Sequence, residues 1–334
     1  MPRTSRGGIE GQGDMRVVRA TALGGPEVLE PAELPDPVAG PGEVVVKVAY
    51  SDTLFVETQI RAGAPGFPVE PPYVPGGGIA GTVLATGDGV DPSWSGRRVV
   101  TTLGWSGGYA EQAVAAATGL VPVPGGLGLR EAAALVHDSA TAMALTDAVA
   151  AREGETVLIL GATGGMGVLL VQLVRATGAR VLAGVRGERK LRLAAELGAD
   201  PVDVSRPDWP RQVSEATAGA GADAVLDGVG GAIGRAAFEV TADGGRFSAH
   251  GTPAGGFAGV APEEARRRGI DLFGITDVQF DRPTRNRWTA LGLRAAAEGR
   301  IRPIIGQTFP LARAADAHAA IEARTVVGKT LLEV

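Results

Sequence analysis

The segment from Thr156 to Gly167 constrains the fold of this chain more than any other. Residues 157–160 are consecutive apolar residues, which indicates a strand buried on both faces, as in a parallel sheet. A glycine-rich turn, an apolar helix at 168–174 and a second apolar strand at 181–185 follow. This order is typical of units that bind a dinucleotide, because glycines admit the pyrophosphate and the helix start favours its negative charge. A plain tight turn between strand and helix is the alternative interpretation. The turn residues predicted to contact the dinucleotide are Ala162, Thr163, Gly164, Gly165, Met166 and Gly167.

Strands and helices continue to alternate after this unit. Further strands are predicted at 224–227, 245–249 and 270–275, with helices near 188–197, 207–218 and 231–240. The alternation predicts an α/β fold with a doubly wound parallel sheet, whose ligand crevice lies at the carboxyl ends of the strands. The residues just after these ends that are predicted to face the ligand are Arg186, Val229, His250, Gly251 and Thr252.

The first third of the chain has β character. Strands at 44–48, 79–85, 97–100 and 109–114 have no helices between them, which predicts an antiparallel, barrel-like domain. An Ala-rich stretch at 129–151 is predicted to form one long helix, and the final strand, 328–334, to return to the first domain. Residues 1–14 are polar and glycine-rich, and we expect a disordered extension there.

Composition and charge exclude several classes of function. A net charge of −5, without a dense basic stripe, argues against a nucleic-acid partner. No apolar run reaches the roughly 18 residues of a membrane span. The chain has no cysteine, which excludes disulfides and thiolate metal sites and fits a cytoplasmic protein. Its histidines, at positions 137, 250 and 318, show no metal-ligand spacing, and His318, on a surface-like helix, is given no role.

Several short motifs occur in a specific order: 23–29, Pro75-Gly76, 107–111, 131–135, 161–167, 197–200 and Gly328-Lys329. With this order and spacing, the chain from about Met15 onward resembles the zinc-independent quinone oxidoreductase-like branch of the medium-chain dehydrogenase/reductase superfamily. The resemblance implies a GroES-like catalytic domain formed by residues 15–128 and 278–334. It also implies a Rossmann domain formed by residues 129–277 that binds NADPH.

The chain departs from that family at informative positions. Zinc-dependent relatives carry Gly-His-Glu where this chain has Gly76-Gly77-Gly78, and they use metal-binding cysteines. Without these ligands no Lewis acid is available to polarise an alcohol, so an ordinary zinc alcohol dehydrogenase is excluded and no metal site is predicted. Quinone reductases of the branch often carry an asparagine and a tyrosine where this chain has Leu54 and Gln59. These changes weaken the case for a simple quinone substrate.

Charge after the second strand of the dinucleotide-binding unit indicates the cofactor. NAD-specific sites place an acidic residue there, whereas this chain has Arg186, with Lys190 one turn into the next helix. Both cations suit the 2′-phosphate of NADPH, and the resemblance also places a phosphate-binding lysine at Lys190. Glu188 is interpreted as a first-turn helix residue. The alternative interpretation is that the two cations lie on a solvent-exposed loop and helix face and bind no phosphate. Thr141 and Lys329 are also predicted to contact the cofactor.

Without metal or thiol, reduction of a quinone or of an enone C=C bond is the available chemistry, because hydrogen-bond donors can stabilise the charge that develops on oxygen. The candidate catalytic residues are Tyr50, Gln59 and His137. Tyr50 could instead pack in the core, and His137 could instead bind a backbone carbonyl.

The leading hypothesis is a cytoplasmic, metal-free NADPH-dependent reductase that transfers hydride to a small-molecule substrate, either a quinone or the C=C bond of an α,β-unsaturated carbonyl. Reduction of a larger natural-product enone and a non-catalytic NADPH-binding sensor are the alternatives. The apolar strand at 270–275 is expected at an open edge of the sheet and has few charged residues to discourage pairing with another strand. We therefore expect a homodimer in which two copies of this strand pair.

Overall fold

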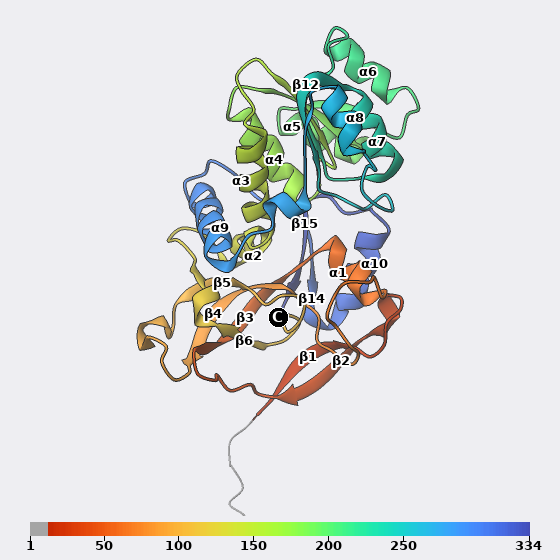
Figure 1. Cartoon of the computed structure of the whole chain (residues 1–334). Coiled ribbons are helices and arrows are strands. Elements are labelled where there is room, and N and C mark those ends of the chain that lie inside the picture. Colours follow the sequence, from red (N-terminus) through yellow and green to blue (C-terminus); the bar gives the residue numbers. More distant parts are fainter. Residues whose placement is uncertain (1–12) are drawn as a thin grey trace, which may run out of the picture.

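The computed structural model describes residues 13–334, which form two lobes (Figure 1). Of the extension predicted over residues 1–14, only Gly13 and Asp14 belong to the described residues, and Asp14 already opens the first strand. None of the described helices is long and apolar enough to cross a membrane.

The lower lobe in Figure 1 is built on a sheet with strand order β14-β15-β3-β4-β5-β7, with β6 also paired to β3 and a separate β1-β2 pair. All of these pairs are antiparallel except β14-β15, so the predicted antiparallel domain contains one parallel pair. The strands are β1 Asp14–Ala20, β2 Leu29–Pro35, β3 Glu43–Thr53, β4 Gly78–Thr86, β5 Arg98–Thr102, β6 Gln112–Ala116, β7 Val121–Pro122, β14 Ile305–Pro310 and β15 Lys329–Glu333.

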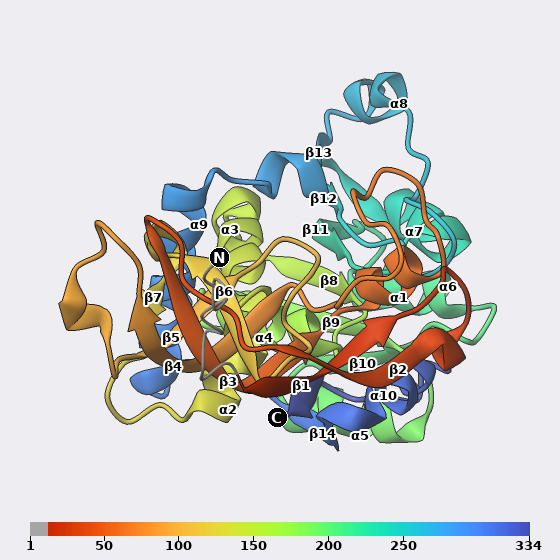
Figure 2. The ribbon, with the colours of Figure 1, turned by 90° about the horizontal axis from the view of Figure 1, so that it is seen from below.

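The end of the chain returns to the lower lobe, as predicted. Strand β15 pairs antiparallel with β3, with Leu332 opposite Ser51. Leu331 and Leu332 point to opposite faces of the strand and are both fully buried. Leu332 packs in a cluster with Val18, Leu29 and Leu311, and Figure 2 shows β1, β2, β14 and α10 gathered beside the C-terminus.

The upper lobe contains the predicted doubly wound sheet. Its strand order is β10-β9-β8-β11-β12-β13, and every pair is parallel. The order reverses between β8 and β11, and the carboxyl ends at such a point form the ligand crevice of this architecture. Strand β10 is short and polar and was not predicted. The strands are β8 Thr156–Leu160, β9 Arg180–Val185, β10 Asp200–Asp203, β11 Ala222–Asp227, β12 Thr241–Ala249 and β13 Asp271–Gly274.

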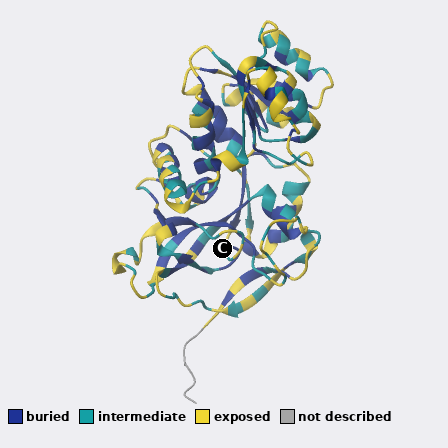
Figure 3. Cartoon of the chain, viewed as in Figure 1, coloured by how far each residue is buried: buried dark blue, intermediate teal, exposed yellow. Residues whose placement is uncertain are grey.

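The central strand β8 is buried on both faces, which explains its unbroken apolar sequence. Val157 and Ile159 belong to the core cluster that includes residues of α3 and α4, whereas Leu158 and Leu160 pack with Phe238 of α7. Figure 3 shows buried residues concentrated in the sheet and in the helix faces turned toward it. The helices are α1 Phe55–Arg61, α2 Leu129–Leu135, α3 Asp138–Val149, α4 Gly165–Arg175, α5 Glu188–Glu196, α6 Trp209–Ala216, α7 Gly231–Glu239, α8 Pro262–Arg267, α9 Arg282–Ala297 and α10 Ala314–Glu322.

Among the boundaries that differ from the sequence prediction, two bear on the site and on the sheet edge. The Ala-rich stretch 129–151 is not one helix: it breaks into α2 and α3 at residues 136–137. The break places His137 immediately before α3, where its side chain contacts a carboxylate of β3. The edge strand predicted at 270–275 ends at Gly274, and a 3-10 turn begins at Ile275.

Candidate active site

The glycine turn after β8 has the close packing that its sequence predicts. Gly161 adopts φ +71°, a left-handed conformation that favours glycine, and its N–H donates to the carbonyl of Gly184 at 3.0 Å. A β-carbon at Gly167 would clash with the carbonyl oxygen of Gly161, so only glycine lets α4 approach β8 this closely. The first N–H groups of α4 have no acceptor within the helix and are open to an anion.

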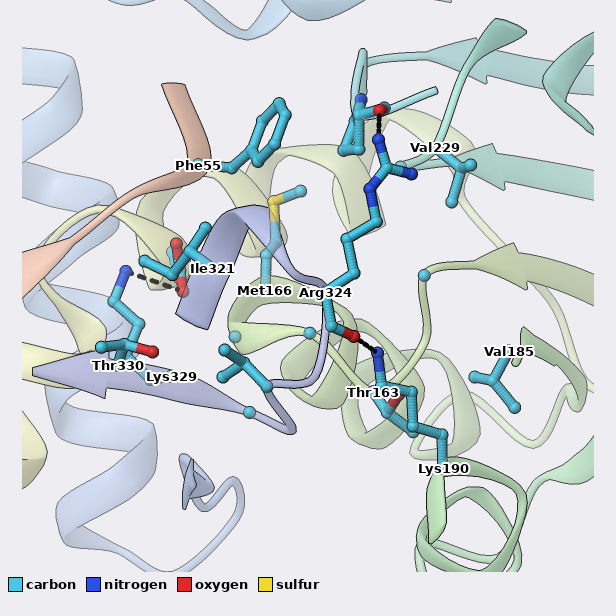
Figure 4. A pocket seen from close by; sticks show the side chains of 18 of the residues that line it. Phe55, Thr163, Met166, Val185, Lys190, Val229, Ile321, Arg324, Lys329 and Thr330 are labelled. Carbon is cyan, nitrogen blue, oxygen red and sulfur yellow. Dashed lines mark hydrogen bonds and ion pairs between the residues drawn. The ribbon is translucent and has the colours of Figure 1, made fainter. Parts of the chain in front are cut away.

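A pocket of about 290 Å³, here named the narrow pocket, lies at the carboxyl ends of β8, β9 and β11 (Figure 4). Elements far apart in sequence close it, because the N–H of Gly328 donates to the carbonyl of Thr163 at 2.7 Å and ties β15 to the glycine turn. The predicted cofactor residues that line it are Thr163, Gly164, Gly165, Met166, Arg186, Lys190, Val229 and Lys329.

Positive charge gathers at the β9 end of the narrow pocket. Arg186, Lys190 and Arg324 all line it, and the ammonium of Lys190 donates to the backbone carbonyl of Arg324 at 2.9 Å. Burial, followed by the charges of Arg186 and Arg324, lowers the pKa of Lys190. An anion bound here would relieve this repulsion. Glu188 opens α5 as predicted, with its side chain 90% exposed, and does not line the pocket. A glycine turn open to pyrophosphate and a separate cation cluster together fit a dinucleotide that carries an additional phosphate.

A second pocket of about 1000 Å³, here named the wide pocket, adjoins the first. Its walls are mainly apolar and aromatic, and include Phe55, Phe67, Trp105, Phe257 and Phe280. Among the predicted site residues, the catalytic candidates Gln59 and His137 line it, together with Thr141, Gly164, Gly165, Met166, Gly167, His250 and Thr252.

Three of the predicted site residues line neither pocket. Ala162 is fully buried in the glycine turn, and Gly251 packs against the backbone of Gly228, where a β-carbon would clash. The third is Tyr50, one of the catalytic candidates. Its hydroxyl donates to Glu333 at 2.9 Å, because its position on β3 faces the end of β15.

A group of buried charges connects the two lobes beside the pockets. The ammonium of Lys329 lies 3.2 Å from Asp52 Oδ2 and 3.2 Å from Asp138 Oδ2. Burial alone would lower the pKa of Lys329, but Asp138 and Asp52 outweigh it and hold this pKa above its ordinary value. Gly165 leaves room for the group, since a β-carbon there would clash with the Asp138 carboxylate.

A second buried network lies behind the first and involves Glu57 of α1. Its carboxylate accepts hydrogen bonds from the N–H groups of Gly77 at 2.7 Å and Leu54 at 3.0 Å, and from the Tyr109 hydroxyl at 3.0 Å. Burial and the charge of Asp52 raise the pKa of Glu57 to about 7. The Tyr109 hydroxyl also lies 2.9 Å from His318 Nε2. His318 is fully buried, so its predicted place on a surface-like helix was wrong.

Sequence reasoning missed Asp52 and the cation Arg324. Asp52 lies near the end of β3, after its apolar residues and outside any recognisable motif. Arg324 lies 134 residues from Lys190, which it approaches only in the folded chain. No feature of the sequence indicated the helix break before Asp138. Within residues 13–334, no group of three or more His, Asp or Glu side chains is placed to hold a metal ion.

Comparisons with known proteins give consistent matches along most of the chain. Residues 40–125 match the model of the alcohol dehydrogenase GroES-like domain, and residues 197–332 match that of the zinc-binding dehydrogenase domain. The quinone oxidoreductase of Lama guanicoe is 32% identical over 92% of this chain and 94% of its own length. A mycobacterial protein solved in complex with NADPH superimposes with a TM-score of 0.87 at 31% identity, covering 96% of this chain and 100% of the other. A structure described as an NAD-dependent alcohol dehydrogenase superimposes with a TM-score of 0.85 at 34% identity, with the same coverage.

Proposed function

Because the chain belongs to the zinc-independent quinone oxidoreductase-like branch of the medium-chain dehydrogenase/reductase superfamily, we propose that it is an NADPH-dependent reductase of a quinone or of the C=C bond of an α,β-unsaturated carbonyl. Membership of this family makes the chain an oxidoreductase. The observation that carries the proposal is the junction of the narrow and wide pockets at the glycine turn. The residues that line both pockets are Leu54, Phe55, Asp138, Gly161, Gly164, Gly165, Met166 and Gly228.

The residues around the narrow pocket support NADPH rather than NADH. The glycine turn and the start of α4 would hold the pyrophosphate, and Arg186, Lys190 and Arg324 would hold the 2′-phosphate. The two solved relatives differ in the cofactor named for them, NADPH for one and NAD for the other. The cations around Lys190, with no acidic side chain lining that end of the narrow pocket, therefore decide our choice.

The wide pocket supports an apolar acceptor. Its aromatic walls suit a flat or extended apolar molecule, and polar side chains among its lining residues, including Gln59, Thr141 and His137, can orient a carbonyl oxygen. When bound, the dihydronicotinamide supplies the two electrons and the hydrogen of the reduction. The protein excludes water from the acceptor, positions it, and stabilises the oxygen on which charge develops.

A larger enone of the natural-product type is the second candidate substrate. A volume of about 1000 Å³ is at the upper end for small-molecule pockets, and Leu54 and Gln59 line it where quinone reductases often have asparagine and tyrosine.

We infer a cytoplasmic location, with which a chain without cysteine agrees.

The proposed activity can be tested by incubating the protein with NADPH and a panel of quinones, enals and bulky enones. Oxidation of NADPH is measured as the loss of its near-ultraviolet absorbance. Turnover of any of these acceptors supports the reductase, and the preferred acceptor separates the two substrate classes. Tight NADPH binding with an inert panel would instead favour a non-catalytic sensor.

A cofactor variant tests the assignment of the cations. Replacing Arg186 and Lys190 with glutamine should weaken NADPH binding by roughly tenfold or more per lost contact, since charge-assisted hydrogen bonds contribute about 1.5–3 kcal/mol. NADH binding should change little. Arg192→Gln, on the exposed face of the same helix and away from both pockets, is the matched control. Equal losses for both cofactors would contradict the assignment.

A further inference from the structure

One histidine of the chain lies in the wall of the wide pocket with a buried carboxylate behind it. We propose that His137, oriented by Asp52, is the acid that delivers a proton to the oxygen of the bound acceptor. The inference rests on the proposed reductase function and adds to it the identity of the proton donor, which sequence reasoning left unassigned among three candidates.

The geometry leaves one ring nitrogen of His137 free for the acceptor. Its Nδ1 lies 2.9 Å from Asp52 Oδ2, so this nitrogen is engaged. Asp52 is fully buried, and its Oδ2 is also held by the ammonium of Lys329 at 3.2 Å, which fixes the carboxylate. The side chain of His137 remains 21% exposed and lines the wide pocket. Nε2 is therefore the nitrogen available to a molecule in that pocket.

Two glycines make room for this pair. A β-carbon at Gly78 would lie 2.6 Å from Asp52 Oδ1 and 2.7 Å from the imidazole of His137. A β-carbon at Gly77 would be 3.5 Å from the same ring. These are the positions at which zinc-dependent relatives carry His and Glu. In this chain the space beside β4 is filled instead by an imidazole from the break between α2 and α3 and a carboxylate from β3.

The charges around His137 favour its protonated form. Burial opposes protonation, but Asp52 of β3 and Glu57 of α1 outweigh burial and the cation Lys329 of β15, and the pKa of His137 is raised above its ordinary value. Asp138, the acidic residue next in sequence, pairs with Lys329. The other histidines behave differently: burial lowers the pKa of His250 to about 4 and that of His318 to about 3. His250 also lines the wide pocket but is neutral at neutral pH.

The proton balance of the reaction is complete with this assignment. Reduction of a quinone to a hydroquinone, or of an enone to an enol, adds one hydride, which carries both electrons, from the cofactor and one proton from the protein. The Nε2–H bond of His137 breaks as an O–H bond forms on the acceptor oxygen. The neutral imidazole keeps its other proton on Nδ1, donated to Asp52, and water restores the first proton before the next turnover.

Substitution of His137 tests its role in catalysis. His137→Gln should lower kcat about 100-fold or more, within the usual range for a lost general acid, and leave the dissociation constant of NADPH unchanged. In the wild type, kcat should fall as the pH rises through the pKa of His137, and this dependence should be absent from the variant. Arg192→Gln, at an exposed position that lines neither pocket, should keep the wild-type kcat and pH dependence. Unchanged NADPH binding shows that the site of the His137→Gln variant is still folded.

NMR titration of the histidines gives a readout that requires neither cofactor nor acceptor. The chain has only three histidines, and we expect one of them, absent from the His137→Gln spectrum, to titrate above the ordinary range. Asp52→Asn should lower this pKa and shift the fall in kcat to lower pH. A His137→Gln enzyme with wild-type kcat and pH profile would overturn the inference and leave the reductase function standing. A wild-type protein inert toward the whole panel would refute the reductase function, and the proton donor with it.

Discussion

Replacing Lys329 with methionine tests whether one buried cation holds the charges of the site together. Lys329 is 3% exposed, and its ammonium lies 3.2 Å from a carboxylate oxygen of Asp52 and of Asp138. Methionine is a flexible apolar residue that can fill much of the same space. The variant therefore removes a charge while creating little cavity, and its effect on stability reports the electrostatics of the group.

The size of the effect follows from these distances. At an effective dielectric constant of about 20, unit charges 3.2 Å apart attract by about 5 kcal/mol. The measurable loss is limited, because a stranded carboxylate can bind a proton, at a cost of about 4 kcal/mol at pH 7 for an ordinary aspartate. His137 also stays beside Asp52 as a second partner. We expect the free energy of unfolding to fall by about 3–5 kcal/mol, as for other broken buried ion pairs.

The pH dependence of this loss has a definite sign. Burial would raise the pKa of Asp52, but Lys329 and His137 outweigh it and lower that pKa in the wild type. Its stabilising contribution is therefore present above the unfolded pKa of about 3.9 and is lost as the pH falls through the folded pKa. Without Lys329 the pKa of Asp52 should rise. The variant should then gain stability relative to the wild type as the pH falls from 7, by at most about 1.4 kcal/mol per pH unit.

Urea unfolding followed by the fluorescence of the chain's four tryptophans measures this difference at several pH values. Lys47→Met, at an exposed position on β3, is the matched control and should change stability by less than about 0.5 kcal/mol. A loss at Lys329 no larger than about 1 kcal/mol, the value of an exposed ion pair, would refute the reasoning. So would a difference between variant and wild type that does not change with pH.

Four further predictions concern the glycine turn, metal independence, assembly and the role of Tyr50. Gly167→Ala should weaken NADPH binding in a fluorescence titration, because its β-carbon would clash with the Gly161 carbonyl; unchanged binding would argue against the turn as the pyrophosphate site. Prolonged chelation should leave activity and thermal stability unchanged, whereas zinc lost in step with activity would contradict the metal-free proposal. Strand β13 is the edge of its sheet, so light scattering should give twice the chain mass of 33.9 kDa, and Leu272→Pro should shift the protein toward monomer; a wild-type mass of one chain would contradict the dimer. Tyr50→Phe should leave kcat unchanged, since that hydroxyl bonds Glu333 away from both pockets; a large loss would return Tyr50 to the site.

The sequence by itself determined the parts of this protein that depend on neighbours along the chain. The unbroken apolar run of β8 indicated a strand buried on both faces, and the glycines after it indicated a turn into α4. Arg186 directly follows β9, and Lys190 lies in the first turn of the next helix, α5. Because they are so close in sequence, it was predictable that both would line one pocket. These features follow from local backbone geometry and side-chain periodicity, which a single segment carries.

Only the tertiary structure decided which distant groups meet. Asp52 and His137 are 85 residues apart. Lys329 reaches Asp52 because β15 returns to pair with β3. The helix break that places His137 lies in a stretch whose alanines all favour helix, so local preference alone would have continued the helix through it. The glycines at 77 and 78 showed only that zinc ligands were missing, and the fold shows that an imidazole takes the space. Long-range pairing of charges depends on the packing of both lobes, and no single segment of the sequence encodes it.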